Sequence, residues 1–433
     1  MKKLFCLFLI IVTQFIFAQD NLTVVAVGDA ELEKQKIIFV EDNKVSISAR
    51  VREVLESDFG FYKSVFNVEA NSSGKKLPLD EFEKLKTNGY SYVISLSYSG
   101  TSPNVKVKAK VINVGQKGII AEHEISVYPE TLRKNVHWLS NSIYRSILGK
   151  ESIFSSKIIF VSDKGSSSQN PYKELYMMDF DGKNITKLTN HRGTVIGPAI
   201  SYEGDKVLYS LIKGGKRKRN VNLYVMDIAT RKTSLLSSRR GLNTGAVFSP
   251  KRDKVILTLS HQGNAEIYEM DIKTKKLMRL TKNFAPDVDP SINIQANKLA
   301  FLSGRPGKPM IYTMNPSGLE QDVKRVSFIG QFNATPRFNP KGDEIAFSSW
   351  LDNRFDIFRI NADGSGLYRL TKDFGSNEDP TYSNDGEFIA FSSQRVISSS
   401  QAVQNIYIMS REGEIIGRVT EGFGNCITPR WSK

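Results

Sequence analysis

Short apolar runs separated by turn residues recur along residues 157–433. The pattern is clearest at Pro336–Ser349, PRFNPKGDEIAFSS, where a short strand, a turn at Pro340–Asp343 and a second strand at Ile345–Ser348 follow one another. Proline pre-sets φ for such a turn and glycine supplies a positive φ. A short apolar run bounded by turn residues is typical of a buried strand. The stretch therefore predicts a β-hairpin.

This hairpin pattern repeats with a nearly constant period. Related stretches begin at Pro198, Ala246, Pro290 and Pro380, and a fragment, TPRWSK, carries the same anchor at Pro429. The anchors 198, 246, 290, 336, 380 and 429 are 48, 44, 46, 44 and 49 residues apart. A period near 45 residues with several short strands in each unit is the signature of a β-propeller with one four-stranded blade per repeat.

Two further strands complete each repeat. An aliphatic–aromatic pair opens the third strand at Leu175-Tyr176, Leu223-Tyr224, Ile267-Tyr268, Ile311-Tyr312, Ile357-Phe358 and Ile406-Tyr407. The fourth strand closes on Lys187-Leu188-Thr189, Ser234-Leu235-Leu236, Arg279-Leu280-Thr281, Arg325-Val326-Ser327, Arg369-Leu370-Thr371 and Arg418-Val419-Thr420. Six such units predict six blades.

The two ends of the repeat region complement each other. The final segment PRWSK has the first strand of a repeat without the second, and KIIFVSD from Lys157 has the second without the first. Joined, they make one repeat, so we expect the two ends of the propeller to share a blade and to leave no free sheet edge.

Residues 19–150 lack the repeat and mix helix and strand patterns. Strand-like runs lie at 22–27, 36–40 and 61–68 and begin again at Tyr92, Val105 and Ala121. Amphipathic patterns predict helices over Val45–Ser57, over Leu79–Gly89 and from Thr131 to Gly149. The expected fold is a small N-terminal α/β domain at 19–150, a linker at 151–156 and an all-β six-bladed propeller at 157–433.

The first residues predict export. Lys2 and Lys3 precede the apolar run LFCLFLIIVTQFIFA, which ends at Ala18, and this pattern is typical of a cleaved signal peptide at 1–18. An uncleaved membrane anchor is the alternative, but the apolar run is short for a span. Cleavage removes Cys6 and leaves only Cys426, so no intramolecular disulfide is expected in the mature chain.

The chain is basic, with a net charge of +15 that falls to +13 without Lys2 and Lys3. The densest basic run, Lys213 to Arg219, lies between two predicted strands of one blade. It is either a solvated hairpin loop or a contact for an anionic surface such as lipid or cell-wall glycan. Export and the absence of aromatic residues among these cations argue against nucleic acid.

Catalytic and metal-binding patterns are absent from the sequence. The four histidines, His123, His137, His191 and His261, form no zinc motif, and the sequence has no nucleophile turn, Walker loop or dinucleotide fingerprint. Asp179–Gly182 and Asn361–Gly364 resemble the start of a calcium loop, but neither continues to the glutamate that such a loop needs. Both are interpreted as hairpin turns. No enzyme activity, cofactor or metal is predicted.

A binding surface is expected at the connections that lead from the last strand of one blade to the first strand of the next. In a propeller these connections surround one end of the channel and form a rim. The predicted rim residues are Ile196, Gly197, Leu242, Thr244, Gly245, Val288, Asp289, Ala334, Thr335, Glu378, Asp379, Ile427 and Thr428. They mix apolar, hydroxyl and acidic side chains, which suits a protein partner.

The order of these parts resembles the TolB family. The resemblance rests on the leader, the small α/β region, blades close to P-x-F-S-P-D-G-x-x-I-A-F-x-S … L-Y-V-M-D … L-T, the stretch Glu174–His191, and the ending PRWSK. It covers essentially the whole mature chain. It implies a monomeric, non-enzymatic periplasmic scaffold of the Tol–Pal system, which supports outer-membrane integrity and constriction at cell division.

The resemblance also implies partners. The rim would bind the peptidoglycan-associated lipoprotein Pal, and the mature N-terminus would contact the inner-membrane protein TolA. Other outer-membrane proteins are further candidates. The expected TolA-contacting segment is Asn21 to Leu32, with its contacts at Asn21, Leu22, Thr23, Val24, Val25 and Val27.

Two other classes of function remain open from the sequence. One is a secreted propeller that binds cell-wall glycan or anionic lipid through its basic surface. The other is a propeller enzyme or the gating domain of one. High salt should abolish the first kind of binding, whereas a complex between the rim and a protein should largely survive it.

Overall fold

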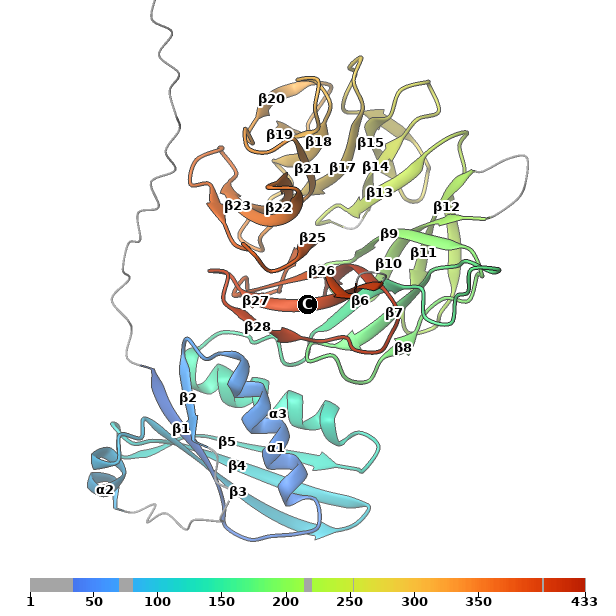
Figure 1. Cartoon of the computed structure of the whole chain (residues 1–433). Coiled ribbons are helices and arrows are strands. Elements are labelled where there is room, and N and C mark those ends of the chain that lie inside the picture. Colours follow the sequence, from blue (N-terminus) through green and yellow to red (C-terminus); the bar gives the residue numbers. More distant parts are fainter. Residues whose placement is uncertain (1–33, 70–80, 214–219, 252, 399–400, 433) are drawn as a thin grey trace, which may run out of the picture.

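The chain folds into a small α/β domain and a six-bladed β-propeller that pack directly against each other (Figure 1). The computed structural model describes residues 34–69, 81–213, 220–251, 253–398 and 401–432. The predicted signal peptide and the segment Asn21 to Leu32 lie outside the described residues, as does the basic run apart from Lys213. The predicted fold class is confirmed.

The small domain is a five-stranded mixed sheet with helices. Its strands are β1 (Gln35–Glu41), β2 (Phe66–Glu69), β3 (Tyr92–Thr101), β4 (Asn104–Asn113) and β5 (Gly118–Val127), in the order β2-β1-β3-β4-β5. Its helices are α1 (Ser48–Phe61), α2 (Phe82–Thr87) and α3 (Leu132–Leu148). Helices α1 and α3 cover the face of the sheet that is turned toward the propeller (Figure 1).

Local sequence explains most of these elements. Helix α3 ends where Gly149 adopts φ +70° and donates its N–H to the carbonyl of Arg145. The alternation of apolar residues and lysines in β4 places the valines and the alanine in the core and the lysines outside it. Lys106 and Lys108 pair with Glu124 and Glu122 across the strand pair.

Several predicted boundaries in this domain were wrong, among them the end of α1, which lies at Phe61 rather than Ser57. Helix α1 starts at Ser48 rather than Val45, because the Ser48 hydroxyl accepts the N–H of Val45 at 2.9 Å and closes a turn there. The strand expected over 61–68 is limited to Phe66–Glu69. Tyr62 instead ends the helix and starts a turn, since its carbonyl accepts the N–H groups of Val65 and Phe66.

The described part of the propeller contains six four-stranded blades. The first three complete blades consist of β9 (Thr194–Ile200), β10 (Lys206–Ile212), β11 (Val221–Asp227) and β12 (Thr233–Ser237); β13 (Asn243–Phe248), β14 (Lys254–Leu259), β15 (Glu266–Asp271) and β16 (Leu277–Arg279); β17 (Asp287–Ile292), β18 (Leu299–Ser303), β19 (Met310–Asn315) and β20 (Gln321–Arg325). The next two consist of β21 (Phe332–Phe338), β22 (Glu344–Leu351), β23 (Arg354–Asn361) and β24 (Tyr368–Arg369); β25 (Ser376–Tyr382), β26 (Phe388–Ser398), β27 (Gln401–Ser410) and β28 (Ile415–Arg418).

The repeated sequence positions make repeated hydrogen bonds. Asn339 caps the first turn of its blade, where its side-chain oxygen accepts the N–H of Gly342 at 2.8 Å. The hydroxyl residue two positions after the fourth strand accepts the N–H of the aliphatic residue of the predicted pair in the third strand. This bond measures 2.8–2.9 Å and recurs at Leu175–Thr189, Ile267–Thr281, Ile311–Ser327, Ile357–Thr371 and Ile406–Thr420. The aliphatic–aromatic pair and the terminal hydroxyl thus form one structural unit.

The ring closes as the sequence predicts. The sixth blade takes its inner strand, β29 (Cys426–Trp431), from the C-terminal end and its other strands, β6 (Lys157–Ser162), β7 (Glu174–Asp179) and β8 (Thr186–Lys187), from the start of the propeller. Strand β29 pairs antiparallel with β6, with Trp431 opposite Ile158. The Trp431 indole N–H also donates to the Ser156 hydroxyl at 2.7 Å.

A continuous apolar core joins the two parts of the molecule. It contains Phe59 and Tyr144 from the helices together with Phe160, Phe388 and Trp431 from the propeller. At its centre the Tyr62 hydroxyl donates to the Asp385 carboxylate at 2.6 Å and accepts the N–H of Ile153 at 3.0 Å. Residues 151–156, expected to be a linker, contribute the fully buried Ile153 and Phe154 to this core.

The closing strand gives a stability test. Trp431→Ala should lower the free energy of unfolding by about 3–5 kcal/mol, because it leaves a large buried cavity and removes the hydrogen bond to Ser156. Trp138→Ala is the matched control, since that side chain is 53% exposed. Denaturant unfolding of the mature chain measures both. Equal stability of the two variants would contradict a closing role for Trp431.

Candidate binding site at the channel mouth

One residue in each inner strand has a left-handed backbone. These six bulge positions are Gly197, Gly245, Asp289, Thr335, Asp379 and Thr428, with φ between +50° and +58°. Each lies at a register shift in the pairing of the inner strand with its neighbour. A bulge of this kind lets a strand continue while it redirects its side chains. The predicted rim residues next to the anchors therefore lie inside inner strands rather than in loops.

Two of the bulges are held by a hydrogen bond to the preceding blade. The N–H of Asp289 donates to the Thr258 hydroxyl of β14 at 3.2 Å, and the N–H of Asp379 donates to the Ser348 hydroxyl of β22 at 3.1 Å. These bonds fix the entrance of the channel from blade to blade.

Nine of the predicted rim residues line one cavity of about 350 Å³, which we call the channel mouth. They are Gly197, Leu242, Thr244, Gly245, Val288, Asp289, Thr335, Asp379 and Thr428. The other four, Ile196, Ala334, Glu378 and Ile427, belong to the same inner strands but are not part of its lining. Ile427 packs instead in the core between blades.

Sequence reasoning missed two charged residues of the mouth. Arg337 and Arg430 line it from the position directly after the anchors Pro336 and Pro429. The signal was visible in the repeated P-R-F and P-R-W of the sequence. Its meaning depends on the bulge, because the bulge decides which face of the inner strand meets the channel.

The mouth contains both signs of charge in a half-buried setting. Arg337 pairs with Asp289 at 2.9 Å. Burial raises the pKa of Asp379, and burial together with Asp379 raises the pKa of Glu378 to about 7. Burial, and then the neighbouring Arg337, lowers the pKa of Arg430 to about 9.

Exposed aromatic side chains lie at or near the start of two of the inner strands. Phe284 and Phe328 lie in the connections that lead into the inner strands β17 and β21, and they are 87% and 70% exposed. Phe332 opens β21 opposite Trp350 of β22, and both are partly exposed. Large apolar groups left in water on one face are a common mark of a protein-binding surface.

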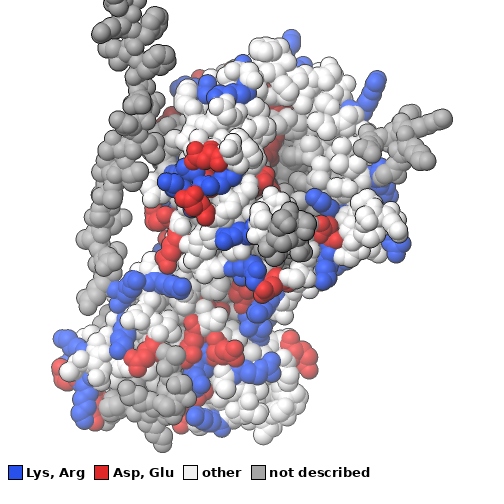
Figure 2. Space-filling model, in the orientation of Figure 1, with Lys and Arg blue, Asp and Glu red and all other residues white. Residues whose placement is uncertain are grey.

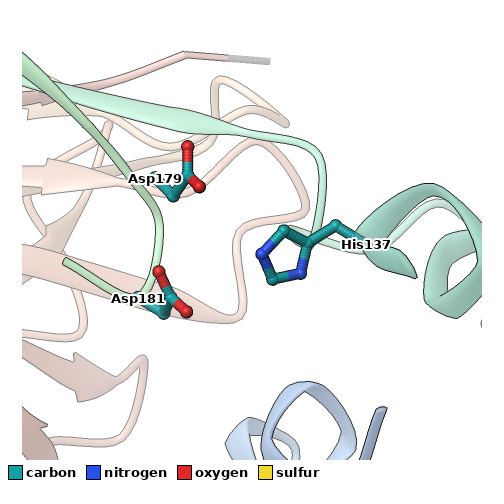
Figure 3. A group of neighbouring side chains, drawn as sticks. All are labelled: His137, Asp179 and Asp181. Atoms are coloured by element: carbon teal, nitrogen blue, oxygen red, sulfur yellow. The ribbon is translucent and has the colours of Figure 1, made fainter. Parts of the chain in front are cut away.

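A second group of polar residues lies at the boundary with the small domain. His137 projects from α3 toward Asp179 and Asp181, which lie at the end of β7 and in the turn after it (Figure 3). The spacing of these three side chains would allow a metal ion. However, Asp179 pairs with Lys157, Asp181 pairs with Arg133, and the His137 Nδ1 lies 2.9 Å from the Asp58 carboxylate. We therefore interpret the group as an ion-pair network between the domains.

The two D-x-D-G-like stretches have turn geometry. Gly182 and Gly364 adopt φ +83° and +95°, and their N–H groups donate to the carbonyls of Asp179 and Asn361 at 2.9 Å.

Within the described ranges, no helix combines the length and apolar character that a membrane span requires.

The family model of the TolB beta-propeller domain matches residues 144–395, which is more than half of the chain. The chain belongs to the TolB family. A TolB homologue of Chlorobium luteolum is 29% identical over 365 residues, which cover 84% of this chain and 79% of that protein.

A second sequence relative matches over a shorter span, whereas a solved structure matches over nearly the whole chain. A TolB homologue of Chlorobium chlorochromatii is 32% identical over 224 residues, 52% of this chain and about half (48%) of that protein. The crystal structure of TolB from Acinetobacter baumannii superposes with a TM-score of 0.78 at 21% identity, covering 93% of this chain and 98% of that one. That likeness supports the fold of this TolB family member.

The bulge geometry predicts a cost for a side chain at Gly245. A Cβ there would lie 3.3 Å from both the Asp289 Cα and the Thr258 hydroxyl, at φ +58°. Gly245→Ala should therefore lower the free energy of unfolding by about 1–2 kcal/mol. In the control Gly417→Ala, the new Cβ would meet nothing within 4 Å. Thermal unfolding compares them, and a Gly245→Ala variant as stable as Gly417→Ala would refute the strained geometry.

Proposed function

We propose that this TolB family member is a non-enzymatic periplasmic protein of a Tol–Pal system, and that its channel mouth binds a Pal-like lipoprotein. Family membership supports the proposal, and relatives from Ruegeria and Syntrophotalea carbinolica are named Tol-Pal system protein TolB. Each of these two relatives matches this chain over less than half of its own length. Membership of a Tol–Pal system, and the partners that this membership implies, are therefore proposals for this protein.

The single observation that carries the proposal is the convergence of six blades on one mouth. Nine residues predicted from the repeat pattern line one cavity, and the exposed Phe284 and Phe328 lie in the connections that lead into two of its inner strands. Interfaces draw most of their affinity from a few large side chains that become fully buried. We infer that these two phenylalanines act as anchors for a partner that docks at the mouth.

Binding to glycan or lipid through a basic surface has less support. Figure 2 shows Lys and Arg interspersed with Asp and Glu over the visible face of the small domain. Much of the visible propeller surface carries neither sign of charge. The basic run that motivated this alternative lies, apart from Lys213, outside the described residues.

The first test uses the aromatic anchors. The mature chain serves as bait for detergent-solubilised envelope, at low and high salt, with mass spectrometry of the bound proteins. Phe284→Ser combined with Phe328→Ser should lower recovery of a small peptidoglycan-binding lipoprotein at least about tenfold, because each buried aromatic anchor is worth about 2 kcal/mol.

Trp138→Ser is the matched control, since Trp138 is exposed on α3 of the small domain. It should retain full recovery in both salts. Full recovery by the double phenylalanine variant would remove the mouth as the binding face. Recovery of only lipid or glycan, lost at high salt, would favour the alternative function.

We further propose that the segment Asn21 to Leu32 contacts a TolA-like inner-membrane protein, as the family resemblance implies. Deleting residues 21–32 should abolish recovery of the inner-membrane partner and leave recovery of the lipoprotein unchanged, because the mouth is built from other residues. The same capture experiment measures both partners. Undiminished recovery of the inner-membrane partner by the deletion variant would contradict the assignment.

A further inference from the structure

Four side chains lie where two cavities of the channel adjoin. A second cavity of about 240 Å³ lies beyond the mouth and is lined by residues from the ends of the inner strands. Ala199, Val247, Arg337 and Arg430 line both cavities. We call these four residues the waist. They occupy one equivalent position in β9, β13, β21 and β29, directly after the anchor of each repeat.

The two guanidinium groups of the waist differ in their ion-pair partners. Arg337 has a carboxylate partner in Asp289 at 2.9 Å, although its Nε has no hydrogen-bond partner among the described residues. Arg430 is only 6% exposed, and its Nη1 donates to the carbonyl of Pro429 at 2.7 Å. No carboxylate in the described part of the chain lies within 4.0 Å of Arg430.

Burying a cation without an ion partner costs free energy, and at Arg430 this cost is reflected in a lowered pKa. Burial, followed by repulsion from Arg337, lowers the pKa of Arg430 to about 9. Asp379 and Asp289 attract it only from beyond ion-pair distance. An anionic group placed against Arg430 would recover this energy, and a guanidinium can hold a carboxylate with two parallel hydrogen bonds.

The residues that line the cavity beside Arg337 and Arg430 determine which other groups a ligand could carry. Ala199 and Val247 give the waist an apolar side, and Val288 and Leu242 extend it into the mouth. The buried hydroxyl of Thr428 lines the same cavity and has no hydrogen-bond partner among the described residues. A small apolar body with an oxygen-rich head would satisfy both sides, and the cavity volumes suit a small ligand.

We propose that the waist binds a carboxylate carried on a short aliphatic chain, with Arg430 as its principal donor and Arg337 as its second. The aliphatic part packs on Ala199 and Val247. The carboxylate comes either from a free small molecule or from an acidic side chain of a protein docked at the mouth. The second source rests on the proposed function.

The test titrates the mature chain with glutarate, followed by calorimetry and ligand-observed NMR. The neutral isostere glutaramide is the matched ligand. Wild type should bind glutarate and not glutaramide, and Arg430→Gln should weaken glutarate binding at least about tenfold. Arg240→Gln is the matched protein control, because Arg240 is exposed in the connection before β13 and outside the cavity. It should bind as wild type does.

Should Arg430→Gln fail to fold, Arg430→Lys keeps the charge but loses the paired donors, and it should weaken binding at least about threefold. The proposal is overturned if wild type fails to bind glutarate, if glutaramide binds equally well, or if substitution of Arg430 leaves the affinity unchanged.

The source of the carboxylate is decided by competition. Saturating glutarate should lower recovery of the mouth partner from envelope if that partner supplies the carboxylate, and should leave it unchanged if the ligand is a free molecule. Failure of the proposed function would appear as no partner recovered at all. The glutarate titration on the isolated chain is independent of that result.

Discussion

The pairing of β29 with β6 is the interaction on which the rest of the structure depends. A propeller whose ends do not pair would expose two strand edges and open its channel. Two further hydrogen bonds between Lys157 and Ser432 hold the closing pair. The Ser432 hydroxyl accepts the N–H of Lys157, and the carbonyl of Lys157 accepts the N–H of Ser432, each at 2.8 Å. Trp431 and Phe160 of this blade also belong to the core shared with the small domain. Ring closure and domain packing therefore use the same side chains.

The six bulges share one backbone conformation but carry different side chains. All six adopt nearly the same φ, although the residues are two glycines, two aspartates and two threonines. The left-handed conformation costs free energy for a residue other than glycine, and at Asp289 and Asp379 a hydrogen bond from the preceding blade holds it. The ring thus presents equivalent positions whose side chains differ from blade to blade. The bulge positions are glycines in two neighbouring blades and aspartate or threonine in the other four.

Sequence predicted the features that depend on local pattern. The hairpin at Pro340–Asp343, the blade count and the shared sixth blade follow from period and turn chemistry, and the rim residues follow from their distance to each anchor. Side-chain contacts between the small domain and the propeller were not predictable. Tyr62 and Asp385 are 323 residues apart, and only the docked fold brings them together. The repeated P-R-F and P-R-W mark Arg337 and Arg430, but whether these side chains face the channel depends on a register shift that the sequence pattern does not reveal.

The polar residues at the domain boundary serve orientation more than stability. Asp58 is buried with His137 and Ser140, and burial raises the pKa of its carboxyl. Replacing buried charged groups with apolar ones often costs nothing, but an apolar boundary permits several packings, whereas paired charges permit few. The pair Arg133–Asp181 crosses from α3 to the turn after β7 and restricts the rotation of one part on the other. The ion pair between α3 and the turn after β7 therefore favours one relative orientation of the small domain and the propeller.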